Sequence, residues 1–112
     1  MDPILRASII DRSAYGCDLC RRPLSEDRWE CHHRQLRAQG GKDSLANLLA
    51  LHDRCHQWIH HHPAWSYGQG FLVPSYHDPL LWRVWRWRAV WMAPGAEWVL
   101  ADPHPEQRGG AA

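Results

Sequence analysis

Residues 51–60 have the sequence LHDRCHQWIH, and residues 17–20 have the sequence CDLC. Each stretch contains a pair of metal-ligating side chains with two residues between them. Two matched pairs of this spacing supply the four ligands of a closed, tetrahedral zinc site of the Cys3His type. The sequence therefore predicts a small fold held together by a structural Zn2+ ion, with Cys17, Cys20, His52 and Cys55 as its ligands.

The cysteine content supports this interpretation. The chain has four cysteines and begins without a visible secretory signal. We therefore expect metal binding in a reducing compartment rather than a disulfide framework. Cys31 lies outside the two pairs, and we expect it to be a small strand residue, with a ligand role as the alternative. The competing interpretation of both pairs is that they are ordinary buried cysteines.

A second set of histidines surrounds the second pair. His56 and His60 are four residues apart, so on a helix they share one face and can hold one ion. Cys55 and His56 point about 100° apart on that helix and therefore serve different sites. His32 and His33 point to opposite faces of an extended chain, so one can bind metal while the other does acid–base work. The alternative for His56 and His60 is a solvated helix face.

Composition limits the remaining possibilities. The 112 residues correspond to one domain, 1–112, whose core is small enough for a structural metal to help it fold. A hydrophobic content of 45% excludes disorder, and a net charge of +1 excludes a polycationic coat. No run of about 18 apolar residues is present, so we expect no membrane span.

Local patterns predict the secondary structure on either side of the ligands. Asp2 and Pro3 are typical of a helix start, Gly40-Gly41 of a loop, and Pro94-Gly95 of a turn. Asp53 is expected to cap the second helix, and Pro63 to end it. The predicted helices are 3–12, 54–61 and a single turn at 64–69, and the predicted strands are 29–34, 48–51, 70–74, 82–92 and 98–100.

Two basic regions are candidates for contact with a partner. Residues 21–42 hold six cations and three carboxylates, a net charge of about +3. Within them, Arg34, Arg37 and Lys42 are the candidate phosphate contacts, with a solvated loop face as the alternative. Residues 82–91 alternate Trp with Arg, which suits a hairpin packed on the core, a stacking platform for DNA or a docking surface for a protein.

Taken together, these motifs resemble the HNH endonucleases, and most closely their small phage-encoded type. The resemblance extends over residues 17–62, and weakly to Pro74. His52 stands where many relatives have Cys, and it still suits zinc. The matching motifs are the CxxC at 17–20, ECHHR at 30–34, Gly40-Gly41, NLL at 47–49 and the ligand-rich stretch at 51–60.

The resemblance implies a ββα-metal, treble-clef-like core. With the N-terminal helix and the C-terminal Trp-rich β-hairpin that local patterns predict, the expected fold class is α+β. The resemblance further implies that His32, His56 and His60 hold a catalytic divalent ion such as Mg2+, Mn2+, Ni2+ or Zn2+. It assigns His33 as general base and Asn47 as an orienting residue. The implied reaction is hydrolysis of DNA to 5′-phosphate and 3′-hydroxyl ends.

The resemblance also sets expectations for organisation and partners. The expected core is 17–62, followed by an extension at 63–101 and a flexible tail at 102–112. DNA is the expected substrate, a phage terminase a partner in DNA packaging, and the bacterial cytoplasm the location. One rival is a non-catalytic zinc module that binds DNA or a packaging protein, which would not need His33. A metal-sensing or storage protein is the other, and it leaves Asn47 unexplained.

Overall fold

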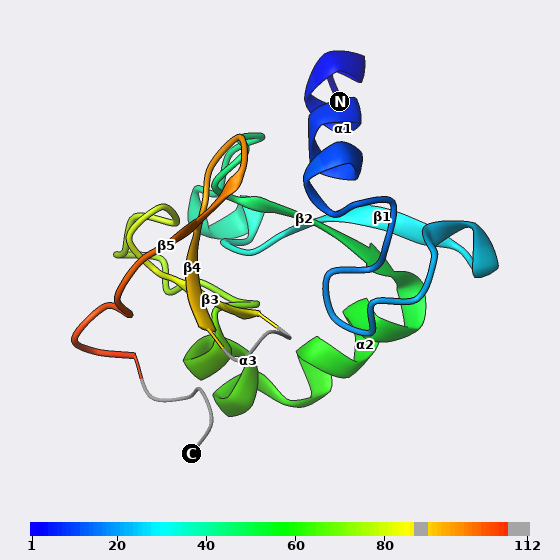
Figure 1. Cartoon of the computed structure of the whole chain (residues 1–112). Helices are drawn as coiled ribbons and strands as arrows, with labels where there is room; N and C mark the ends of the chain where they lie inside the picture. The colour runs from blue at the N-terminus through cyan, green and yellow to red at the C-terminus, as the bar shows by residue number, and fades with distance from the viewer. Residues whose placement is uncertain (87–89, 108–112) are drawn as a thin grey trace.

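The computed structural model describes residues 1–86 and 90–107. Figure 1 shows an α+β arrangement, as predicted, with two separate antiparallel sheets and helices beside them. Within the described residues, no helix has the length and apolar character needed to cross a bilayer. The elements are α1 (Pro3–Arg12), β1 (Trp29–His33), β2 (Leu48–His52), α2 (Asp53–His61), α3 (Pro63–Gln69), β3 (Val84–Arg86), β4 (Val90–Pro94) and β5 (Trp98–Leu100), with 3-10 turns at Leu24–Glu26 and Arg37–Gln39.

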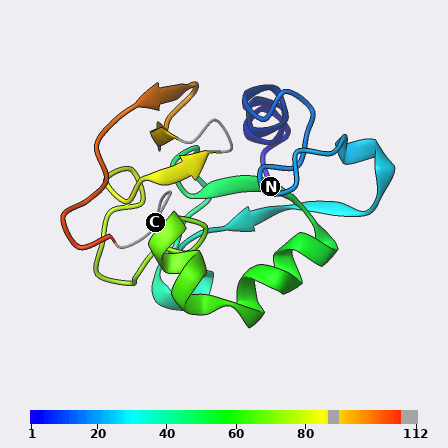
Figure 2. The same cartoon turned by 60° about the horizontal axis from the view of Figure 1, so that its bottom comes forward.

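The first sheet and the second helix form the predicted ββα unit. β1 and β2 pair antiparallel, with His32 opposite Leu49 and His33 opposite Leu48. Every residue of β2 is buried, which explains the apolar run at 48–51 that precedes His52. β2 continues directly into α2, which packs against both strands. Because of this direct junction, which can be followed along the ribbon in Figure 2, His52 at the end of β2 is only three positions from Cys55 in the first turn of α2.

The first helix begins as the sequence predicts. The Asp2 carboxylate accepts a hydrogen bond from the Ile4 amide at 2.8 Å, and Pro3 occupies the first turn. The helix projects from the rest of the molecule at its N-terminal end (Figure 1). Its last turn is anchored, because Ile9 is fully buried and Arg12 donates to the carbonyls of Leu45, Leu48 and Gly95.

The C-terminal sheet has the strand order β3-β4-β5, and β4 and β5 form the predicted hairpin. Its principal link to the rest of the chain is a buried ion pair, in which Arg86 donates to Asp18 at 2.7 Å. Asp18 lies between the first two cysteines, and its carboxylate also accepts the Ala50 amide at 2.8 Å. The guanidinium of Arg86 lies 4.0 Å above the Trp98 ring. A cation from the extension therefore balances a buried carboxylate in the core.

Two predicted details of the ββα unit and its flank are wrong. Asp53 does not cap α2, because it is the first residue of the helix and the N-cap is His52. Its carboxylate in the first turn still suits the positive end of the helix dipole. Residues 70–74 do not form a strand. Gly70 ends α3 in a left-handed conformation, φ 89°, and the Phe71 amide then donates to Ser66.

The C-terminal region differs from its prediction in two ways. The stretch 82–92 contains two strands, β3 and β4, rather than one, and Trp87 and Arg88 lie outside the described residues. The expected tail at 102–112 is packed in its first part. Gln107 is 8% exposed and bonds both the amide and the carbonyl of Arg83, at 2.8 Å each. Residues 108–112 lie outside the described part of the chain.

Candidate metal centres and active site

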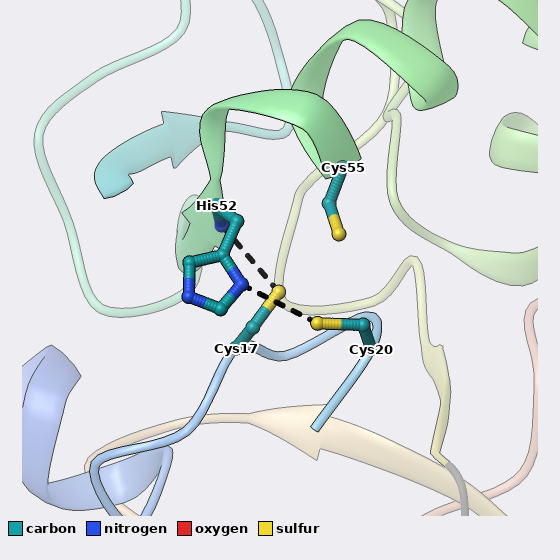
Figure 3. Close-up of side chains that lie close together, drawn as sticks. All are labelled: Cys17, Cys20, His52 and Cys55. Carbon is teal, nitrogen blue, oxygen red and sulfur yellow. Dashed lines mark hydrogen bonds between the residues drawn. The ribbon is translucent and has the colours of Figure 1, made fainter. Parts of the chain in front are cut away.

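The four sequence-predicted zinc ligands converge at the junction of β2 and α2. Figure 3 shows Cys17 and Cys20, which lie on the segment that follows α1, facing His52 and Cys55. One nitrogen and three sulfur atoms lie within 4.8 Å of one another. The Cys20 Sγ to His52 Nδ1 distance is 3.4 Å, close to the separation of about 3.5 Å between two ligands of one tetrahedral zinc.

The surroundings of His52 fit a zinc ligand. Its Nε2 lies 3.1 Å from the Pro23 carbonyl, so this nitrogen carries the proton and donates. The lone pair is then on Nδ1, which faces the sulfurs (Figure 3). A metal-ligating histidine commonly donates its other ring N–H to a carbonyl in this way. The backbone amide of His52 also points at Cys17 Sγ, at 3.5 Å. The residues therefore fit Zn2+.

The thiols do not titrate alike. Burial raises the pKa of Cys17. It also raises the pKa of Cys55, together with the neighbouring Cys17 sulfur. Burial acts in the same sense on Cys20, but the Arg22 amide and the His52 ring outweigh it and lower the pKa of Cys20 to about 7. Zinc binding to this cluster must therefore release protons from the two buried thiols.

The second cluster joins one strand to one helix. His32 comes from β1, and His56 and His60 lie one turn apart on α2, as the spacing predicts. One nitrogen from each ring lies within 4.8 Å of the others, and the ring centroids are 4.7–5.8 Å apart. The Nε2 atoms of His56 and His60 are 3.0 Å apart, which suits adjacent ligands with bonds of about 2.1 Å to one ion.

His32 supplies the test of whether this cluster fits a metal. Its Nε2 lies 2.8 Å from the Phe71 carbonyl and donates to it. In the described residues, its buried Nδ1 has no hydrogen-bond partner. Burial lowers the pKa of His32 to about 3, so the ring is neutral near pH 7. A neutral ring with a buried, unpaired nitrogen beside two other imidazoles is a ready ligand for a divalent ion.

His33 lies beside this cluster but has a different partner. Its Nε2 is 2.6 Å from the Asp43 carboxylate. The hydrogen bond from His33 lowers the pKa of Asp43, and Arg37 at 3.7 Å acts in the same sense. An ionised carboxylate only accepts, so Nε2 of His33 donates and its lone pair is on Nδ1. Asp43 was missed at the sequence level, because nothing in its spacing connects it to His33.

The loop that carries Asp43 is fastened at its base by Asn47. This side chain is 1% exposed, accepts the Gln35 amide at 2.7 Å and donates to the carbonyls of Gln35 and Lys42 at 3.0 Å. The backbone also approaches closely at Gly41, where a Cβ atom would lie 1.7 Å from the Gln35 carbonyl oxygen. Only glycine fits there. This close approach allows the loop to return to the end of β1.

One surface depression is lined both by residues of the three-histidine cluster and by His33. The lining includes His32 and His56 from the three-histidine cluster. It also includes His33 and the Arg37 side chain, which faces Asp43. Of these side chains, Arg37 is exposed and His33 partly exposed, whereas His32 is buried. The lining residues are Glu30, Cys31, His32, His33, Leu36, Arg37 and His56. Cys31 is half-buried outside both clusters, as expected for a strand residue.

The structure contradicts one of the three predicted phosphate contacts. Arg34 is 0% exposed, so the prediction that it contacts DNA is wrong. Its guanidinium donates to the carbonyls of Gly70, Ala46, Pro79 and Trp82. These carbonyls replace the water molecules that would bond an exposed guanidinium. Burial lowers the pKa of Arg34 to about 9, which leaves it cationic at pH 7. Arg37, which lines the depression, and Lys42, which precedes Asp43 in the chain, are both exposed.

Comparison with known proteins agrees with this geometry. Residues 17–62 match the family model described as HNH endonuclease. No curated protein and no solved structure matches the chain. The matched segment contains the Cys3His cluster, the three-histidine cluster and His33. Residues 17–62 are therefore similar to the HNH endonucleases, and this similarity supports a nuclease that cleaves DNA.

Proposed function

We propose that this protein is a metal-dependent endonuclease that hydrolyses DNA phosphodiester bonds, with its catalytic unit in residues 17–62. The observation that carries the proposal is the shared depression. It combines two histidines of the cluster, His56 and the burial-neutralised His32, with His33, whose Nε2 donates to a carboxylate. A module that only binds DNA has no use for this pair of features. The similarity of the same segment to HNH endonucleases supports the proposal.

In the proposed reaction, His33 is the general base. Asp43 accepts a hydrogen bond from the Nε2–H group and holds the ring, so Nδ1 is free to take a proton from water. The water oxygen forms a bond to phosphorus as the bond to the 3′ oxygen breaks, and the departing 3′ oxygen takes a proton from solvent, which leaves 5′-phosphate and 3′-hydroxyl ends. Such a base is worth about 10²–10⁴ in rate. Asn47 keeps the Asp43 loop in place through its bonds to Gln35 and Lys42.

The proposed ligands of the catalytic ion are His32, His56 and His60. When bound, a divalent ion such as Mg2+, Mn2+, Ni2+ or Zn2+ supplies Lewis-acid stabilisation of the phosphate and the leaving oxygen. The three rings are proposed to hold it without neutralising its charge, because His32 is an uncharged donor. Arg37 and Lys42 are the proposed contacts to neighbouring phosphates, since both are exposed, Arg37 lines the depression and Lys42 precedes Asp43 in the chain.

The wider setting is also a proposal. We propose that the enzyme is phage-encoded, acts in the bacterial cytoplasm and assists a phage terminase in DNA packaging. This part rests on the resemblance of the motif set alone. Co-purification of the tagged protein with a terminase subunit from infected cells is the direct test of the partnership.

Plasmid cleavage tests the nuclease itself. Supercoiled DNA should be cut by the wild-type protein with an added divalent ion and left intact with excess EDTA. His33→Ala should lose about 10²–10⁴ in rate, while His61→Ala, an exposed histidine on the same helix, should keep it. Equal cleavage by all three proteins would mean a contaminating nuclease. The rival, a non-catalytic zinc module, would then be favoured.

A further inference from the structure

A third group of metal-ligating side chains lies outside the ββα unit. His77, His104 and Glu106 each place one ligand atom within 4.8 Å of the other two. His77 belongs to the loop that follows α3, and the other two belong to the packed part of the C-terminal segment. We propose that these residues form a Zn2+ site that fastens residues 102–107 to the loop at 74–79. This inference is independent of the nuclease activity.

The geometry of the group is compact and backed by an aromatic ring. His77 Nε2 lies 2.5 Å from a Glu106 carboxylate oxygen. The rings of His77 and His104 are 4.5 Å apart, and they lie 4.7 and 5.4 Å from the Trp82 ring. The His77 side chain is 13% exposed, whereas that of Glu106 is 59% exposed. The ligand atoms are thus shielded on the Trp82 side and open to solvent on the Glu106 side.

The C-terminal segment is held in position without any ion. Gln107 fastens it to the Arg83 backbone with two bonds of 2.8 Å. The same side chain accepts the His104 amide at 3.0 Å, and the Gln107 amide donates to the His104 carbonyl at 2.8 Å. The two ligands on this turn, His104 and Glu106, are already ordered and therefore lose little entropy when they bind an ion.

The donor set selects the class of ion. Two imidazoles and one carboxylate form one of the common three-ligand sets of zinc, with a fourth position left to water. His104 Nδ1 now accepts the Glu106 amide at 3.1 Å, so an ion at this nitrogen has to displace that bond. The site is therefore weaker than the Cys3His cluster, in which the His52 Nδ1 already faces three sulfurs.

The position of the site gives it a structural role. The loop at 74–79 contacts Gln35, two positions beyond the end of β1, because the Gln35 side chain donates to the carbonyls of Pro74 and His77 at 2.9 Å. An ion held at His77 ties this loop to the C-terminal segment. It therefore stiffens the backbone two residues beyond His33.

Zinc stoichiometry tests the proposal on the full-length protein. The wild type, His104→Ala, Glu106→Gln and the control His61→Ala are dialysed against a series of free Zn2+ concentrations. Bound zinc is then measured by mass spectrometry. At saturation, His104→Ala and Glu106→Gln should each bind one equivalent less than the wild type, in the weakest class of site, while His61→Ala should match the wild type. Equal stoichiometry in all four proteins would overturn the proposal, as would an equal loss in the control.

A second measurement covers a variant that folds poorly. Glu106→Gln alters a mostly exposed side chain, so its fold should persist and it decides the outcome if His104→Ala unfolds. Zn2+ should slow hydrogen exchange of the Gln107 amide several-fold in the wild type and leave it unchanged in Glu106→Gln. Slowing of equal size in both proteins would show that the ion acts elsewhere and would refute the site.

Discussion

The two clusters of the ββα unit share a helix but differ in chemistry. Cys55 and His56 are neighbours on α2, yet the first belongs to a four-ligand cluster and the second to a three-ligand cluster. Three thiolates and one imidazole around Zn2+ leave a net charge of about −1 and no open position. Three neutral imidazoles leave the full charge of a divalent ion, with room for phosphate and water. Ligand type and number therefore separate the proposed structural site from the proposed catalytic site within one turn of helix.

The surroundings strengthen the contrast. The Cys3His cluster is surrounded by groups that fix its ligands, such as the Pro23 carbonyl against His52. The histidine cluster has one anchored ligand, His32, and an open side that contains His33. A loss in the first cluster should destroy the fold, whereas a loss in the second should leave the fold and remove activity.

The largest expected effect is the loss of one zinc thiolate. Cys17→Ser should lower the melting temperature by more than about 20 °C, because zinc binding in so small a domain contributes most of the folding free energy. Circular dichroism during heating, with zinc content measured in parallel, checks this. Cys31→Ser is the matched control, since Cys31 is half-buried outside the cluster, and it should shift the melting temperature by only a few degrees. Similar melting of both variants would remove the distinction between the clusters.

The next effect separates the metal ligands from the base. His56→Ala should weaken metal binding, so added divalent ion should partly restore cleavage. His33→Ala should keep the wild-type metal dependence and lose about 10²–10⁴ in rate at every ion concentration. Initial rates over a metal titration distinguish the two. If added metal restores His33→Ala but not His56→Ala, the proposed roles are reversed.

A smaller loss is expected at the buried arginine that joins the core to the extension. Arg34→Met fills similar space but leaves four carbonyl groups without their donor. The free energy of unfolding should fall by about 3–5 kcal/mol, as for other buried polar networks that lose one partner. Urea unfolding measures it. A loss below about 1 kcal/mol would mean that water replaces the guanidinium.

The smallest effect is expected at the exposed arginine. Arg37→Ala should weaken DNA binding several-fold across all sequences and lower the slope of log affinity against log salt by about 1. Its unfolding free energy should be unchanged, in contrast to Arg34→Met. Arg22→Ala is the control, because Arg22 is exposed but pairs with Glu26 near the other cluster. A salt slope altered equally by Arg22→Ala would indicate diffuse charge rather than a phosphate contact.

Sequence spacing predicted the ligands because local geometry controls them. The neighbours Cys55 and His56 must diverge on any helix, and residues four apart must share a face. The ββα order and both clusters followed from these local rules together with the resemblance. The chemical role of His33 stays a proposal, since neighbouring residues on a strand only show that His32 and His33 differ.

The rest depended on contacts between distant segments. Arg34 and Arg37 are three residues apart in a basic stretch, and only the return of residues 70–82 over β1 shows that Arg34 is buried. Asp43 reaches His33 because Asn47 folds the loop back. His77 and Glu106 are separated by 29 positions and belong to no spacing motif. None of these pairings has a local signal.

The ion pair between Arg86 and Asp18 bears on how this catalytic unit could be transplanted. Asp18 is inside the segment that matches the HNH family, but its cation comes from β3, which is outside that segment. A graft of residues 17–62 alone would bury an unbalanced carboxylate two residues from Cys20. A transplanted segment built from residues 17–62 must therefore either carry the extension with it or replace Asp18 with a neutral side chain that still accepts a hydrogen bond from the Ala50 amide.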